Sequence, residues 1–201
     1  MSHSDDVRLR AAAPGDAAAV RRIYAPYVRE SAATFRTEVP SVGDVRERIA
    51  ETRAAEEYPW YVAVADDAES SGDGVVGYAY ASRLRERPAY RWAVETSIYV
   101  DRDARRSGIG TRLYDRLLDT LERQGYCSAY AALGMPNPES EAFHERCGFE
   151  RVGRFPAAGF KLGGWHDVVW YRRALREPDG EPAEPRPLSA VDDAFDGADE
   201  A

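Results

Sequence analysis

The sequence predicts one mixed domain of the α/β (α+β) class, and three observations carry that prediction. Residues 60–65, 75–81 and 92–100 are mostly apolar or small and have the two-residue period of a strand. Apolar residues then recur at every fourth position from Ile109 to Leu121, which is typical of one face of a helix. A short apolar run at residues 127–133 indicates a buried strand. The middle of the chain is therefore expected to fold as strand, helix and strand.

The N-terminal part is expected to supply one strand and two helices. Residues 7–10 have a strand pattern, and Asp16 is expected to cap the helix that follows. Pro26 should kink or end that helix, because proline has no backbone N–H. Ser41 and Asp44 have the spacing of a capping box, which predicts the start of a second helix.

The remaining elements complete the predicted sheet. The strand patterns at 60–65 and 75–81 are separated by a turn-rich segment and are expected to form a hairpin. Residues 138–147 predict a short helix that ends before a glycine. Strand patterns at 149–155 and 167–171 follow it.

Composition limits the number of domains and the classes of partner. At 201 residues we expect a single domain over residues 1–176. Residues 177–201 hold nine acidic residues and four prolines, which predicts a disordered acidic tail. The net charge of −8 lies entirely in this tail, so no nucleic-acid partner is expected. Without a long apolar run or the apolar core of a signal peptide, we expect no membrane partner and a cytoplasmic location.

A turn rich in arginine and glycine, residues 105–110, connects the central strand to its helix. Gly108 and Gly110 lack a β-carbon where the backbone turns, and the first N–H groups of a helix have no partner within it. These N–H groups, the helix dipole and the guanidinium groups of Arg105 and Arg106 favour phosphate oxygens. We therefore expect a pyrophosphate at this turn.

Two common nucleotide motifs do not fit this turn. The dinucleotide fingerprint requires a glycine where Leu113 stands, and the P-loop pattern matches nowhere. The pattern from Arg105 to Gly110 resembles the acyl-CoA loop, R/Q-x-x-G-x-G/A, of the GCN5-related N-acetyltransferases (GNAT). An ordinary strand-to-helix turn has the same residue types, so this pattern alone leaves both interpretations open.

Glu95 is the one carboxylate in the strand pattern of residues 92–100. On a strand it shares a face with Ser97 and Tyr99, whereas Thr96 lies on the opposite face. Glu95 is therefore either an exposed strand residue or a general base whose pKa partial burial would raise.

His144 lies in the predicted short helix and is either a structural residue or a catalytic one. The three histidines of the chain form no ligand cluster, so no metal is expected. Cys147 lies three positions later on the same helical face, which raises the idea of a cysteine hydrolase. Nothing in the sequence supplies the third, orienting group that such an enzyme needs.

A basic segment between two predicted strands carries Arg85, Arg87 and Tyr90. One interpretation is a solvated loop. The other is a clamp in which guanidinium groups bind a carboxylate or phosphinate of a substrate.

Longer segments closely resemble the phosphinothricin and methionine sulfoximine N-acetyltransferase group of the GNAT family. They are FRTE (35–38), YPWYVA (58–63), GYAYA (77–81), AYRWAVETSIYV (89–100), RRSGIGTRLY (105–114), GMPNPES before His144, and AAGFKLGGWHDV (157–168). The likeness runs from about residue 7 to residue 171. It implies the GNAT fold, a mixed, mainly antiparallel sheet with splayed central strands flanked by helices, and a homodimer.

The resemblance also implies a reaction, the direct transfer of acetyl from acetyl-CoA to the α-amino group of a small amino-acid-like substrate. Glu95 occupies the family's general-base position. His144 stands where many relatives carry a tyrosine that protonates the leaving thiolate, and it could do the same or act as a second base. The implied substrate positions are Phe35, Arg85, Arg87 and Tyr90. The implied acetyl-CoA positions are Ile98, Tyr99, Val100, Arg105, Arg106, Ser107, Gly108, Ile109, Gly110, Thr111, Asn137 and Ser140.

The sequence does not determine which amine accepts the acetyl group. Arg85 stands where phosphinothricin enzymes tend to carry lysine, so methionine sulfoximine, methionine sulfone or an ordinary amino acid are equally in view. The alternatives are an acetyltransferase for a peptide or another amine, and a non-catalytic acyl-CoA-binding module. Glu95 and His144 count against the module, and Arg85 with Arg87 favours a small anionic substrate.

Overall fold

A computed structural model describes residues 7–65, 74–177 and 180–192 of the chain. The strands are β1 (Val7–Ala11), β2 (Trp60–Ala65), β3 (Val75–Arg83), β4 (Ala93–Val100), β5 (Ser128–Gly134), β6 (Glu150–Lys161) and β7 (Gly164–Ala174). The α-helices are α1 (Ala17–Glu30), α2 (Val42–Ala55), α3 (Ile109–Gln124) and α4 (Pro138–Arg146). None of the helices in these ranges is long and apolar enough to cross a bilayer.

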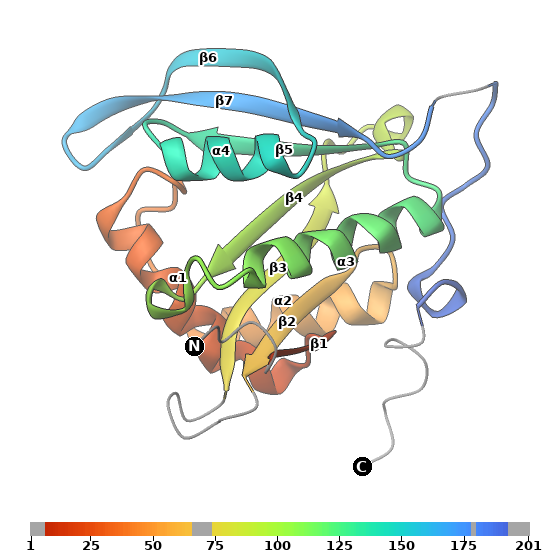
Figure 1. The fold of residues 1–201 in the computed structure, drawn as a ribbon, viewed down its shortest axis with the longest axis horizontal. Coiled ribbons are helices and arrows are strands. Elements are labelled where there is room, and N and C mark those ends of the chain that lie inside the picture. Colours follow the sequence, from red (N-terminus) through yellow and green to blue (C-terminus); the bar gives the residue numbers. More distant parts are fainter. Residues whose placement is uncertain (1–6, 66–73, 178–179, 193–201) are drawn as a thin grey trace.

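The strands form one sheet in the order β1-β2-β3-β4-β5-β7-β6 (Figure 1). All neighbours are antiparallel except β4 and β5, so the expected mixed, mainly antiparallel sheet is confirmed. The parallel pair has only three residue pairs, which end at Glu95 and Tyr130. Beyond Glu95 the two strands part, and this opening positions the candidate site.

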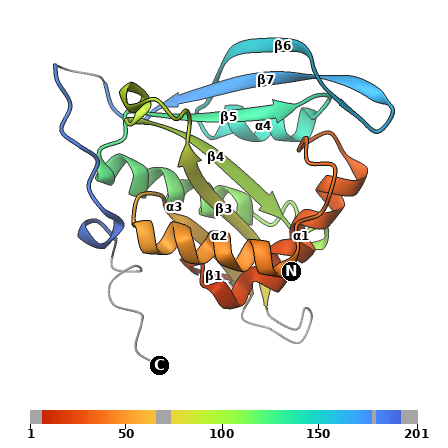
Figure 2. The ribbon, with the colours of Figure 1, turned by 180° about the vertical axis from the view of Figure 1, so that it is seen from behind.

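Helices cover both faces of the sheet, with α1 and α2 on one face and α3 and α4 on the other (Figures 1 and 2). The predicted stripe on α3 is buried, and Leu113, Leu117 and Leu121 have no exposed surface. Burial of one such side chain stabilises the fold by about 1.5–3 kcal/mol. On the other face Ile23 of α1 and Ile49 of α2 belong to a second apolar cluster. The sheet thus lies between two cores.

The expected side-chain cap of α1 is wrong, and Pro26 does not end the helix. Asp16 precedes the helix, but its carboxylate accepts hydrogen bonds from Arg10 at 2.6 and 2.7 Å and from the Ala13 N–H at 2.8 Å, so it caps no N–H group of α1. Pro26 lies within α1, which continues for another turn. Val28 beyond the proline is 1% exposed, so burial of its side chain stabilises this last turn.

The capping box at the start of α2 is confirmed. The Asp44 N–H donates to Ser41 Oγ at 3.1 Å, and the Ser41 N–H donates to Asp44 Oδ2 at 2.8 Å. The expected hairpin is the antiparallel pair β2 and β3, although residues 66–73 of its turn lie outside the described residues. β6 and β7 extend further than predicted, and register shifts within β6 interrupt the alternation of that strand.

The C-terminal region corrects a prediction. Residues 180–192, which we expect from composition to be disordered, pack against the domain with Leu188 at 0% and Asp192 at 1% exposure. The Asp192 carboxylate accepts hydrogen bonds from Arg116 at 2.5 Å and from Tyr61. The prediction of disorder rested on the average composition of this segment. Average composition does not show that a few residues anchor the segment, because their partners lie far away in the sequence. Residues 193–201 of the predicted tail lie outside the described residues.

Candidate active site

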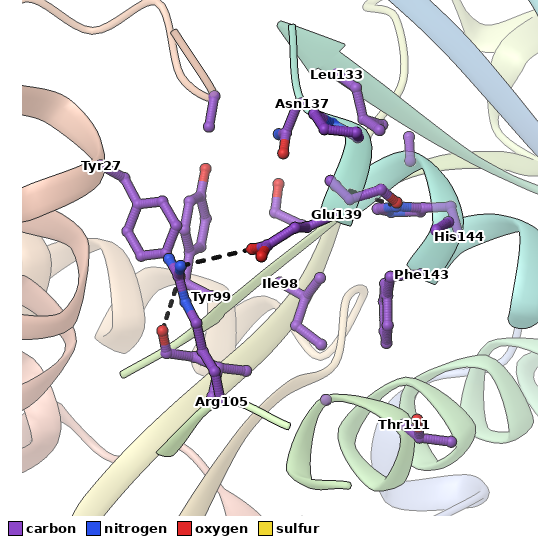
Figure 3. A pocket seen from close by; sticks show the side chains of 18 of the residues that line it. Tyr27, Ile98, Tyr99, Arg105, Thr111, Leu133, Asn137, Glu139, Phe143 and His144 are labelled. Carbon is purple, nitrogen blue, oxygen red and sulfur yellow. Dashed lines mark hydrogen bonds and ion pairs between the residues drawn. The ribbon is translucent and has the colours of Figure 1, made fainter. Parts of the chain in front are cut away.

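A cavity of about 1000 Å³ opens where β4 and β5 part. Its walls include residues 96–100 of β4, residues 131–133 of β5 and the first turns of α3 and α4 (Figure 3). Tyr27 of α1 and Ser31, which directly follows this helix, also line it. On the side that faces β5, residues 96–100 pair with no strand among the described residues, so backbone groups there are available to a ligand.

The first turn of α3 lies at this cavity. Gly108 precedes the helix with a φ of 80°, in the left-handed region where a side chain would be strained. No side chain caps this helix end, and Gly108, Ile109, Gly110 and Thr111 line the cavity. The positive end of the α3 dipole therefore faces open space, as an anion site requires.

Two arginines and a carboxylate line the mouth of the cavity, and Figure 3 shows two of the three, Arg105 and Glu139. Arg105 and Arg106 lie 3.7 and 3.4 Å from the Glu139 carboxylate. The Arg105 guanidinium also lies over the Tyr27 ring, 5.3 Å from its centre. Tyr27 is fixed in turn, because its hydroxyl donates to the Val100 carbonyl at 2.7 Å. An anion that binds both arginines thus competes with Glu139.

The structure brings most of the expected acetyl-CoA positions together. Those that line the cavity are Ile98, Tyr99, Val100, Arg105, Arg106, Gly108, Ile109, Gly110, Thr111, Asn137 and Ser140. Ser107 does not line it. Its hydroxyl donates to the Ala104 carbonyl at 2.6 Å and so holds the turn that presents the arginines.

Glu95 lies where β4 and β5 begin to part, on the opposite face of β4 from Thr96. Thr96 lines the cavity and Glu95 does not. Burial raises the pKa of the Glu95 carboxyl above its ordinary value, and the positive charge of Arg85 offsets part of this rise. Glu95 is therefore a half-buried carboxylate at the apex of the opening, with one cationic neighbour.

His144 lines the cavity, although the residue is only 4% exposed. Its Nδ1 lies 2.8 Å from the Ser140 carbonyl, which can only accept, so Nδ1 carries a proton. Its Nε2 lies 3.0 Å from the Tyr114 hydroxyl. Burial lowers the pKa of His144, and the bond to Ser140 opposes part of that shift. In the neutral ring that this pKa favours, Nε2 is an acceptor.

The expected substrate residues do not gather at the main cavity. Arg85 and Arg87 line a separate space of about 400 Å³ between residues 84–91 and the C-terminal segment. Phe35 packs on Gly159, where an added β-carbon would lie 2.3 Å from its ring. Tyr90 is 44% exposed. Arg85 connects these substrate residues to the apex of the opening. Its guanidinium lies over the Trp170 ring, 5.4 Å from the ring centre, and its positive charge interacts with the Glu95 carboxylate.

Sequence reasoning missed several residues of the site. Tyr27 and Glu139 line the cavity, and Tyr114 reaches it through His144. The apolar period of α3 makes Tyr114 a core residue, and its hydroxyl partner lies 30 positions away. Only the acidic residue at the start of a helix, Glu139, had a detectable sequence signal.

Two alternatives find no support in the geometry. Among the described residues no group of three His, Cys, Asp or Glu side chains is placed to hold a metal ion. Burial raises the pKa of the Cys147 thiol, which disfavours the thiolate that a cysteine nucleophile needs.

Comparison with known proteins assigns the family. A model described as the acetyltransferase (GNAT) domain matches residues 9–170. The chain belongs to this family. A GNAT relative, phosphinothricin N-acetyltransferase of Streptomyces viridochromogenes, is 38% identical over 185 residues, which are 92% of this chain and 94% of the relative.

Two further proteins extend the comparison. The L-methionine sulfoximine/L-methionine sulfone acetyltransferase of Pseudomonas aeruginosa is 33% identical over 167 residues, or 83% of this chain and 94% of that protein. The crystal structure of a phosphinothricin acetyltransferase from Sinorhizobium meliloti, in complex with acetyl-CoA, superposes with a TM-score of 0.80 at 36% identity. It covers 89% of this chain and 94% of the solved chain.

Proposed function

We propose that this GNAT protein transfers acetyl from acetyl-CoA to the α-amino group of a small amino-acid-like acceptor. The observation that carries the proposal is the opening between β4 and β5, which has an anion site at its mouth and Glu95 at its apex. The relatives named for phosphinothricin and for methionine sulfoximine support an acceptor of this size.

The residues at the cavity fit the co-substrate. The N-terminus of α3, Arg105 and Arg106 offer positive charge and N–H donors to a pyrophosphate. The edge of β4 beyond Glu95 offers backbone groups to the amide-bearing arm, and a backbone N–H there can polarise the thioester carbonyl. Acetyl-CoA supplies an activated acyl group, so the protein needs to position it and manage protons.

The proton balance assigns roles to two residues. The acceptor nitrogen is an ammonium before the reaction and carries one proton in the amide product, so it loses two protons. Glu95 takes the first, which frees the electron pair that attacks the thioester carbon. When the carbon–sulfur bond breaks, the thiolate needs one proton. The lowered pKa keeps His144 neutral, and its acceptor atom Nε2 faces the Tyr114 hydroxyl. In the second-base role, His144 therefore takes the second proton through that hydroxyl, and the proton then returns to sulfur.

The acceptor is expected to carry a negative charge. Arg85 and Arg87 belong to the loop that precedes β4, and Arg85 already acts electrostatically on Glu95. A guanidinium in this position can bind a carboxylate in two-point fashion and leave the α-amino group near the base. Phe35 and Tyr90 are the aromatic members of the proposed acceptor site.

The proposal is tested by thiol release from acetyl-CoA. The panel comprises phosphinothricin, methionine sulfoximine, methionine sulfone, the common amino acids and several peptides. Turnover with one or a few small amino acids or analogues is expected. Turnover with peptides alone would replace the small acceptor with a protein substrate. Acetyl-CoA binding without turnover on any amine would contradict the enzymatic assignment.

We further propose that the protein is a homodimer that uses the β6–β7 hairpin. β6 is at the edge of the sheet, and large apolar side chains on the hairpin are 53–68% exposed, namely Val152, Phe155, Phe160, Leu162 and Trp165. Exposed edges and apolar patches of this kind are typical of interfaces. Light scattering is expected to give twice the chain mass, and the variant Trp165→Ser with Phe160→Ser is expected to give a monomer. A monomeric wild type would contradict this proposal.

A further inference from the structure

The C-terminal strap, residues 180–192, is firmly attached to the domain at one end. At the end of α3, the backbone carbonyl of Gln124 accepts from the Arg186 N–H at 2.8 Å, and its side-chain Nε2 donates to the Arg186 carbonyl at 3.0 Å. The Leu188 N–H donates to the Glu56 carbonyl at 2.9 Å, and the Leu188 side chain is fully buried. Asp192 ends the strap in a buried contact with Arg116. In Figures 1 and 2 this blue segment passes the C-terminal end of α3.

The other end of the strap contacts the loop between β3 and β4. Glu184 forms an ion pair with Arg91, and the Trp92 indole N–H donates to the Ala183 carbonyl at 2.9 Å. Trp92 directly precedes β4, and the Trp92 carbonyl accepts from the Cys127 N–H at 2.8 Å, at the start of the parallel pair. The strap therefore contacts the point where the loop enters the strand that carries Glu95.

The loop has few other restraints. Residues 85–91 are all exposed, and their described backbone bonds are those of one short turn, Tyr90 to Arg87 at 3.0 Å and Arg91 to Pro88 at 3.1 Å. A segment with so little buried surface is easily displaced unless another part of the chain holds it. The strap supplies an ion pair, a hydrogen bond and one wall of the 400 Å³ space that Arg85 and Arg87 also line.

We propose that the strap holds the β3–β4 loop in its acceptor-binding arrangement, with Glu184 as a positioning residue. This inference rests on the proposed function, because it takes Arg85 and Arg87 as acceptor ligands. Glu184 acts through Arg91, and the strap's buried end at Leu188 and Asp192 keeps Glu184 in place. The strap thus affects acceptor binding without contact with the acetyl-CoA cavity.

Charge exchange provides the sharpest test. Glu184→Arg and Arg91→Glu each place like charges opposite one another, and the double variant restores an ion pair with its sign reversed. For each single variant we expect the acceptor KM to rise about fivefold, with kcat and the acetyl-CoA KM unchanged, since exposed pairs have modest energies. The double variant is expected to recover most of the loss. Ser189→Ala, in the strap but directed at Glu56, is the matched control.

Hydrogen exchange of peptides that cover residues 84–92 gives a readout that needs no acceptor. Exchange should become about fivefold faster in both single variants and in a truncation after residue 182, and return toward wild type in the double variant. Unchanged exchange would overturn the proposal, as would faster exchange with an unchanged acceptor KM. If wild type acetylates nothing on the panel, the proposed function fails by itself, and exchange still decides whether the strap holds the loop. If the truncation does not fold, Trp92→Phe takes its place in the exchange measurement, because it removes the hydrogen bond to the Ala183 carbonyl. Exchange of the same peptides should then become faster than in wild type.

Discussion

The Tyr114 hydroxyl lies 3.0 Å from Nε2 of His144, and the two residues come from helices that face the same cavity. Because Nδ1 of His144 donates to Ser140, the neutral ring accepts the Tyr114 proton at Nε2. Thr96 contacts the same hydroxyl at 3.0 Å and lines the cavity. The histidine is therefore held at both nitrogens in one orientation, and a proton can reach Nε2 only through the Tyr114 hydroxyl.

Tyr114→Phe removes the partner of Nε2 and keeps the ring. We expect kcat to fall about threefold to tenfold, because one lost hydrogen bond amounts to roughly 1 kcal/mol, while the acetyl-CoA KM stays constant. Steady-state kinetics measures both. Tyr171→Phe is the control, since its hydroxyl bonds to Glu141 and lies outside the cavity lining. An equal loss in both variants would attribute the effect to core packing.

Glu95→Gln removes the proposed base with little change in shape. Turnover at neutral pH should fall about 100-fold or more, in line with the loss of general-base catalysis. Acetyl-CoA affinity, measured by calorimetry, should stay constant because Glu95 does not line the cavity. Glu122→Gln changes an exposed carboxylate on α3 that lines neither the cavity nor the space at Arg85, and should leave turnover intact. Full activity of Glu95→Gln would remove the base assignment.

Arg85→Gln should move the acidic limb of the pH profile of kcat/KM to higher pH. Arg85 favours the charged form of Glu95 and so lowers its pKa, which burial raises. Without Arg85 the pKa rises further, and Glu95 becomes protonated and inactive at a higher pH. The pH at which kcat/KM falls on the acidic side reports the pKa of Glu95 in the free enzyme. A loss in acceptor affinity lowers kcat/KM at every pH but does not move this limb. Arg87→Gln should weaken acceptor binding without moving the limb, and a shift in the opposite direction for Arg85→Gln would contradict the argument.

Glu139→Gln should strengthen acetyl-CoA binding. Glu139 pairs with Arg105 and Arg106 at the mouth of the cavity, so it competes with the pyrophosphate for both. Exposed pairs amount to about 0.2–1 kcal/mol, so the Kd should fall by about twofold to fivefold. Glu141→Gln removes the same charge from the same helix, away from both arginines, and should have a smaller effect. Weaker binding by Glu139→Gln would give Glu139 a direct role in holding the ligand.

Asp192→Ala should destabilise the fold. The Asp192 side chain is fully buried and accepts from Arg116, Tyr61 and Thr120. Because Arg116 is 38% exposed and can be rehydrated, the loss should be about 1–3 kcal/mol in the free energy of unfolding. Urea unfolding measures it. Asp119→Ala, which breaks an exposed pair with Arg123, should change stability by less than about 0.5 kcal/mol. Equal stability of Asp192→Ala and wild type would show that the strap is not anchored there.

Local patterns were sufficient for much of the fold. The four-residue spacing from Ile109 to Leu121 gave the buried face of α3, and the capping box of Ser41 and Asp44 gave the start of α2. Such features depend on residues three or four positions apart, so the sequence displays them directly. Register shifts concealed the full length of β6, because they break the alternation that identifies a strand.

By itself the sequence determined the strand, helix and strand unit, the glycine turn at Gly108 and the resemblance to GNAT acetyltransferases. Only the tertiary structure decided which side chains meet. It placed Glu139 against Arg105, Tyr114 against His144, and Asp192 against Tyr61 at a separation of 131 positions. The parting of β4 and β5 beyond Glu95 likewise depends on how two distant strands pair. Contacts of this kind arise from the packing of whole elements, and no local period or composition in the chain encodes them.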